Sequence, residues 1–200
     1  MTSTRTATIR RETGETVVSL DLNLEGTGQY TIDTGNGMLD HLLAQLSRHG
    51  LFDLTLHAKG DLHTGWHHLV EDVAIALGRA FLAAVGEGKG ITRMGWSLVP
   101  LDETLAQVAV DFSGRGYASI ETRLDGELVE QLPSDLVRHF LETFAVQGQM
   151  TLHANILSGK NDHHKAEALF KALARALSIG VQIDPRRGSD IPSTKGTINS

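Results

Sequence analysis

The sequence contains no cysteine, no apolar run of membrane-spanning length and no excess of basic residues. Without cysteine the chain has no disulfide, no thiolate metal ligand and no cysteine nucleophile. The net charge of −6 argues against nonspecific binding to nucleic acid. Residues 1–5, MTSTR, lead into polar sequence, unlike the apolar core of a secretion signal. We therefore expect a soluble cytoplasmic protein with neither a membrane nor a nucleic-acid partner.

The rest of the composition is typical of a globular protein, with 40% hydrophobic and 21% charged residues. A length of 200 residues suits one domain, or two small halves that share a core. Ten histidines are the one unusual count. The histidines are therefore the first candidates for functional residues.

Four of the histidines belong to a five-residue motif, HHxxE, that occurs twice. Residues 67–71 read HHLVE, and residues 163–167 read HHKAE. At the same offset of 96 positions, and without a gap, TLHA at 55–58 aligns with TLHA at 151–154. A tandem duplication explains a match of this length better than chance does.

Each HHxxE copy stands at the start of a helical pattern, which gives the spacing a chemical meaning. Residues four apart share one face of a helix, so His67 lies beside Glu71 and His163 beside Glu167. Imidazole and carboxylate without thiolate suit manganese, iron or zinc. For a single HHxxE motif, the alternatives to a metal site are a solvent-exposed helix start and a buried histidine whose hydrogen bonds are made within the protein. Two copies at equivalent positions favour a metal site.

The pattern along the chain predicts strands, a helix, a strand and a second helix in each half. The halves join at the glycine-rich residues 86–90, and Ser134 is a plausible N-cap. This order favours an α+β fold in which helices pack on one face of a mixed sheet. The expected strands are 6–9, 17–24, 29–32, 52–58, 93–99, 105–111, 118–121 and 150–157, and the expected helices are 38–49, 67–85, 135–146 and one starting at 163.

Three further segments allow more than one interpretation. The polar residues 10–16 read as a solvated hairpin loop. His41 and Gln45 share a stripe of the helix 38–49, where a lone histidine is more often a surface or core residue than a ligand. Residues 185–196 read as a frayed tail by composition, or as an anion-binding flap because they offer hydroxyl, lysine and arginine groups.

Ordered motifs over nearly the whole chain resemble the imidazoleglycerol-phosphate dehydratase family of histidine biosynthesis, in its monofunctional form. A fused phosphatase half, which some members carry, would not fit in 200 residues. Besides the two HHxxE copies, the motifs that carry the resemblance are residues 11–16, 39–43, 48–54, 101–103, 113–115, 151–153, 159–162, 170–171 and 192–196.

The resemblance implies a fold of two tandem-duplicated halves, each a mixed sheet layer packed on helices, as in the ribosomal protein S5 domain 2-like sandwich. We expect a single domain over 1–200, built of repeats at 1–88 and 91–184 with a C-terminal flap at 185–200. It also implies two manganese ions (Mn²⁺) per subunit. The expected partner is a second copy of the chain, in a homo-oligomer of 24 subunits built from trimers, with sites at the subunit interfaces.

The implied reaction is dehydration of the phosphorylated substrate imidazole glycerol phosphate to imidazole acetol phosphate. No carbonyl activates the carbon that loses its proton, so the imidazole ring must act as electron sink, through an imidazolate and a diazafulvene. Glu15 matches the proton shuttle, and His67, His68 and Glu71 are the other candidate catalytic residues. The implied metal ligands are His41, His67, His68, Glu71, His153, His163, His164 and Glu167. The implied substrate- and phosphate-binding residues are Gln45, Arg93, Arg115, Ser193 and Lys195.

The sequence departs from the family pattern before the first HHxxE. Two acids usually precede that motif, whereas Gly65 and Trp66 stand there, and Leu69 replaces a threonine. Because carboxylates beside metal-bound histidines orient the ring, the first site could be retuned. Trp66 would then line the substrate pocket or pack at a subunit contact; the alternative is simple packing.

Two other functions remain open at this stage. A paralogue could use the same metal pair on another phosphorylated substrate, and the departure at 65–69 is its only support. A metal-assembled scaffold could bind phosphate without turnover, but a scaffold has no use for Glu15. The dehydratase accounts for more of the motifs than either alternative.

Overall fold

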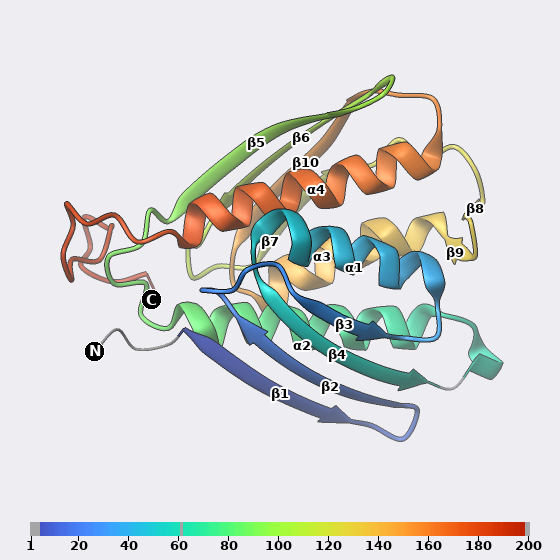
Figure 1. The fold of residues 1–200 in the computed structure, drawn as a ribbon, viewed down its shortest axis with the longest axis horizontal. Coiled ribbons are helices and arrows are strands. Elements are labelled where there is room, and N and C mark those ends of the chain that lie inside the picture. The colour runs from blue at the N-terminus through green and yellow to red at the C-terminus, as the bar shows by residue number, and fades with distance from the viewer. Residues whose placement is uncertain (1–4, 61, 199–200) are drawn as a thin grey trace.

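The computed structural model describes residues 5–60 and 62–198, and shows helices enclosed between two four-stranded sheets (Figure 1). Residues 1–4 of the first expected repeat and 199–200 of the expected flap lie outside the described residues. The elements of the first half are β1 (Thr6–Glu12), β2 (Thr16–Asn23), β3 (Tyr30–Asp33), α1 (Gly37–Gly50), β4 (Asp53–Gly60), a 3₁₀ turn η1 (Leu62–Thr64) and α2 (His67–Val85). Those of the second half are β5 (Met94–Leu101), β6 (Thr104–Asp111), β7 (Tyr117–Glu121), β8 (Leu128–Val129), β9 (Leu132–Pro133), α3 (Ser134–Gln147), β10 (Thr151–Ser158) and α4 (Asp162–Val181).

The two sheets have the same topology, which confirms the mixed sheets predicted for two duplicated halves. The strand orders are β1-β2-β4-β3 and β5-β6-β10-β7. In each sheet the last strand of that order is parallel to its neighbour and the other pairs are antiparallel. Alternate side chains, such as Leu20 and Leu22 on β2, point inward and are buried.

The helices pair across the halves rather than within them. Helix α1 packs on α4, and α2 packs on α3. Aromatic side chains join the second pair, since the rings of Phe81 and Phe144 meet edge to face with centroids 5.5 Å apart. Each helix–helix contact therefore brings together one element from each repeat, and a single core contains side chains of both halves.

The starts of the helices differ between the repeats. The side chain of Asn161 accepts a hydrogen bond from the backbone N–H of His164 and caps α4. At the start of α2, Trp66 occupies the cap position and makes no such bond. The predicted cap of α3 was wrong: Pro133 takes the cap position, and the Ser134 hydroxyl donates instead to the Gly126 carbonyl at 2.6 Å.

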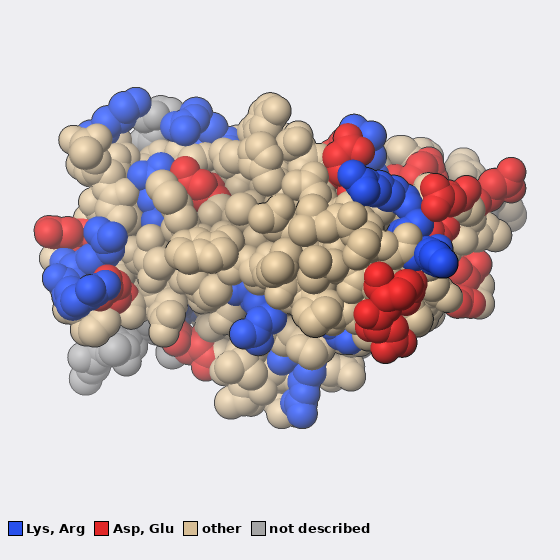
Figure 2. Space-filling view, turned by 90° about the horizontal axis from the view of Figure 1, so that it is seen from above, with Lys and Arg blue, Asp and Glu red and all other residues tan. Residues whose placement is uncertain are grey.

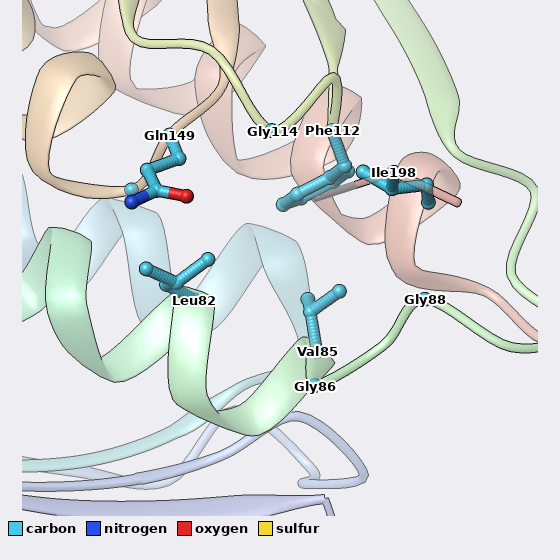
Figure 3. Close-up of a pocket in the computed structure, with 9 residues that line it drawn as sticks. Leu82, Val85, Gly86, Gly88, Phe112, Gly114, Gln149 and Ile198 are labelled. Atoms are coloured by element: carbon cyan, nitrogen blue, oxygen red, sulfur yellow. The ribbon is translucent and has the colours of Figure 1, made fainter. Parts of the chain in front are cut away.

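The segment after α4 folds back onto the end of the α2 helix, contrary to a frayed tail. The amide of Gly90 donates to the Asp190 carbonyl at 2.9 Å. The side chain of Ile198 is only 8% exposed and lies near Val85 and Phe112 (Figure 3). None of the described helices is both long enough and apolar enough to cross a membrane.

Candidate metal centres and anion site

One cluster of possible metal ligands lies between α1 and α4. It consists of His41 from α1 and of His163 and Glu167 from α4, with one ligand atom of each within 4.8 Å of the others. Glu167 Oε2 lies 2.8 Å from His41 Nε2 and 3.3 Å from His163 Nε2. We call these three residues the α1–α4 cluster. It joins the first repeat to the second HHxxE motif.

Glu167 is ionised over a wide pH range in this cluster. Its partial burial alone would raise the pKa, but hydrogen bonds from Lys171 and His41, together with their charges, outweigh the burial and lower the pKa to about 2. A carboxylate that is already ionised and faces two imidazoles is a ready ligand for a divalent cation.

A second cluster lies between α2 and α3 and consists of His67, Glu71 and His139. The rings of His67 and His139 are stacked, with centroids 4.6 Å apart, and Glu71 Oε1 lies 3.7 Å from His139 Nε2. That Nε2 atom is buried and has no hydrogen-bond partner. Because a buried polar atom without a partner is costly, a metal ion fits this α2–α3 cluster.

His139 is not among the ligands that the family resemblance implied, and the 96-residue offset of the repeat does not indicate it either. Under that offset the position of His139 corresponds to Leu43, so the repeat gives no signal. The pairing of the helices, in contrast, does indicate which helix supplies the missing histidine. Because α1 supplies His41 to the motif on α4, the corresponding helix α3 must supply the partner of the motif on α2.

His153 does not lie in either cluster. It is exposed on β10, where its neighbours Leu152 and Ala154 point inward and are buried. Alternation along the strand therefore turns His153 toward the outer face of the sheet, away from the helices. Its ring lies 6.0 Å from that of Tyr117, centroid to centroid.

The second histidine of each HHxxE motif meets a carboxylate from a strand hairpin. Nδ1 of His68 lies 3.0 Å from Glu15, between β1 and β2, and Nδ1 of His164 lies 2.9 Å from Glu103, between β5 and β6. Neither histidine belongs to the two three-residue clusters. Each of these two imidazoles therefore faces a hairpin carboxylate rather than the cluster formed by its neighbour on the helix.

The hairpin that carries Glu15 is attached to α2 by a buried acid. Asp72, whose side chain is 8% exposed, accepts a hydrogen bond from Arg11 at 2.7 Å and another from the Thr16 hydroxyl. The segment 10–16, expected to be a solvated hairpin loop, is thus attached to α2 through one residue of each of its two strands. This attachment places Glu15 beside His68.

Residues 161 and 162 are the polar pair before the second HHxxE, and the carboxylate of Asp162 hydrogen-bonds to backbone rather than to the imidazoles. Asp162 accepts hydrogen bonds from the backbone N–H groups of Asp125 and Gly126 and pairs with Lys165. In the first copy Trp66 is partly buried against the core and Leu69 is buried. These positions agree with the simple-packing alternative for Trp66.

A polar hollow at the other end of the molecule contains four of the five expected phosphate-binding residues. Arg93 is oriented by Asp111, at 2.7 Å, and donates to the Pro192 carbonyl at 2.8 Å. The fifth, Gln45, lies instead on α1, 3.5 Å from His41. The residues lining this anion hollow are Arg93, Ser113, Arg115, Ser193, Thr194, Lys195, Thr197 and Ile198.

The metal clusters and the anion hollow are separated by the length of a helix. His163 is at the start of α4, whereas Arg93 N donates to the carbonyl of Gly180, near its end. Twenty residues of α-helix span about 30 Å. Figure 1 shows the C-terminal segment at the opposite end of the molecule from the starts of α2 and α4. A single chain therefore does not place the metal clusters and the anion hollow next to each other.

Comparisons with known proteins agree on one family. The family model described as imidazoleglycerol-phosphate dehydratase matches residues 34–177. Relatives of that name from Dehalococcoides mccartyi (strain CBDB1) and Roseiflexus sp. (strain RS-1) are 57% and 53% identical over 196 residues, which cover 98% of each chain. Among solved structures, the dehydratase of Staphylococcus aureus matches with a TM-score of 0.81 and 32% identity, covering 90% of this chain and 99% of that one. The Pyrococcus furiosus enzyme, solved in complex with (S)-C348, has a TM-score of 0.80 and 32% identity, covering 94% and 99%.

Proposed function

The chain belongs to the imidazoleglycerol-phosphate dehydratase family, hydro-lyases of histidine biosynthesis, and we propose that it performs that dehydration with two manganese ions per subunit. The observation that carries the proposal is the pair of clusters between the helices. Each combines imidazoles with the glutamate of an HHxxE motif, and one contains a buried imidazole nitrogen without a partner. Such nitrogen and oxygen donors suit manganese.

The metal ligands that we propose follow the contacts in the structure rather than the full set implied by the family resemblance. His139 replaces His153 in the set, because only His139 lies within reach of His67 and Glu71. When bound, the two cations supply Lewis acidity toward the substrate imidazole, which lets that ring accept electrons as the hydroxyl leaves. The proposed ligands are His41, His67, His68, Glu71, His139, His163, His164 and Glu167.

Glu15 is the proposed acid–base group. Its carboxylate is at the hairpin between β1 and β2, and its side chain is about half exposed. It takes the proton from the unactivated substrate carbon at a carboxylate oxygen, and the same group can then return a proton to the leaving hydroxyl. The contacts of Asp72 with Arg11 and Thr16 keep this carboxylate near His68.

The anion hollow is the proposed phosphate site, and a second subunit must bring it to the metal centres. Two guanidinium groups, a lysine and a hydroxyl can hold a phosphate and orient the reacting carbon. Because the hollow lies a helix length from the clusters, the phosphate end of one subunit would face the metal end of another. This separation supports a homo-oligomer with sites at the subunit interfaces, for which we propose the 24-subunit assembly built from trimers that the family resemblance implies.

Exposed apolar side chains support such subunit contacts. Trp96 is 68% exposed on β5, with Met94 and Leu98 on the same side of the strand and more than half exposed. Seen from above, charged groups gather mainly around the margins of the molecule and leave its middle largely uncharged (Figure 2). Large exposed apolar groups of this kind mark contact surfaces.

Complementation between two inactive variants tests the shared site. Glu15→Gln removes the acid–base group, and Arg115→Ala weakens the anion hollow of another subunit. Unfolded and refolded together with Mn²⁺, the two should turn over imidazole glycerol phosphate faster than either alone, because some sites combine two intact halves. The double variant is the matched control and should stay inactive. No recovery in mixed assemblies would contradict a site built from two subunits.

A further inference from the structure

The tip of the β8–β9 hairpin holds a glutamate in an unfavourable backbone conformation. Glu130 and Gln131 form the two-residue turn, and Glu130 has φ of +54°. The first position of such a turn favours glycine, which has no side chain to clash at positive φ. A non-glycine residue keeps such a conformation when the surrounding structure enforces it, and such residues cluster at functional sites.

The Glu130 side chain contacts an imidazole of the α1–α4 cluster. Its Oε1 lies 3.2 Å from Nδ1 of His163, while Nε2 of the same ring faces Glu167. An ionised carboxylate only accepts hydrogen bonds, so the hydrogen must be on Nδ1. Nε2 also faces a carboxylate, that of Glu167, so the contact with Glu130 fixes the orientation of the ring and leaves Nε2 as the nitrogen that would give up its hydrogen to a cation.

The hairpin is held beside both helices of the cluster. Its buried residues Val129 and Leu132 belong to the core. The carbonyl of Gln131 accepts a hydrogen bond from the Asn36 side chain at 3.2 Å, and Asn36 is the cap of α1. The position of Glu130 is thus determined by the same packing that brings His41 and His163 together.

We propose that Glu130 is a positioning residue for His163. By accepting from Nδ1, it leaves Nε2 as the nitrogen that faces His41 and Glu167, and it keeps the ring in that orientation. The inference rests on the proposed metal centre, because the orientation matters only if Nε2 binds a cation. It adds a residue outside the HHxxE motif to the account of that site.

Two substitutions separate this role from a structural one. Glu130→Gly removes the carboxylate and also relieves the positive φ, so the metal-free protein should melt at the same or a higher temperature. Its affinity for Mn²⁺, titrated by electron paramagnetic resonance, should fall about tenfold at one of the two positions. Glu130→Gln keeps an oxygen acceptor and should retain most of the affinity. Glu127→Gln removes a charge from the same loop and should change nothing.

Several results would overturn the proposal. Unchanged Mn²⁺ affinity in Glu130→Gly is one, and a loss of affinity that accompanies a lower melting temperature of the metal-free protein is another. Absence of Mn²⁺ binding by the unsubstituted chain would overturn it together with the metal centre. If the unsubstituted chain binds two ions without dehydrating the substrate, only the proposed function fails, and the Mn²⁺ titrations of the variants still decide the role of Glu130.

Discussion

Glu15 and His68 face each other across 3.0 Å, the one on a strand hairpin and the other at the start of α2. The second repeat has the same arrangement in Glu103 and His164. There, however, Glu103 also accepts hydrogen bonds from the backbone N–H groups of residues 160 and 161, which lower its pKa together with the bond to His164. These donors hold the Glu103 carboxylate in its ionised form as a fixed acceptor, and we propose that Glu15 rather than Glu103 exchanges protons.

Glu15→Gln should abolish most of the turnover without affecting the metal sites. Loss of a general acid–base group lowers kcat by about 10²- to 10⁴-fold. The number of Mn²⁺ ions bound per chain should stay the same, because Glu15 is not a proposed ligand. Steady-state kinetics and metal analysis measure the two effects, and Glu12→Gln on the same hairpin is the control. A variant with near-normal kcat would exclude Glu15 as the proton shuttle.

His139→Ala and His153→Ala should differ in metal content. Without His139 the α2–α3 cluster keeps only His67 and Glu71, so one of the two ions should be lost or bound much more weakly. Without His153 both ions should remain, since this side chain is on the outer face of a sheet. Metal analysis after dialysis measures the content. Loss of an ion in the His153 variant alone would reverse the assignment.

Ile198→Ala should weaken substrate binding and leave kcat nearly unchanged. The buried Ile198 side chain packs near Val85 and Phe112 (Figure 3), and it anchors the segment that carries Ser193 and Lys195, which line the anion hollow. Removing a buried aliphatic group loosens that anchor, and KM should rise about tenfold. Ile198→Val should restore most of the binding, and Ile183→Ala, a partly exposed position, is the control. An unchanged KM would show that the anchor does not position the phosphate groups.

The stabilising effect of Glu167 should depend on pH in the metal-free protein. Its pKa is lowered from 4.5 to about 2, so its ionised form stabilises the fold above pH 4.5, and this contribution is lost as the pH falls through about 2. The difference in melting temperature between the unsubstituted chain and Glu167→Gln should therefore be largest near pH 5 and shrink toward pH 2. A difference that grows on acidification would contradict the lowered pKa.

Short-range patterns predicted the fold well, because alternation along strands and helical spacing are local. The pairing of α1 with α4 and of α2 with α3 depends on packing between distant segments, so no spacing indicates it. For this reason neither helical spacing nor the repeat offset indicated His139, and the ligand set that the family resemblance implied contains His153 instead. The opposite placement of the clusters and the anion hollow is likewise a property of the three-dimensional structure.

Turnover of imidazole glycerol phosphate by metal-stripped protein, titrated with Mn²⁺, tests the central claim most directly. Dehydration should appear as two ions bind per chain, and both ions should be required. Full turnover in the stripped protein, or metal binding and assembly without turnover, would contradict a dehydratase that works through two manganese ions.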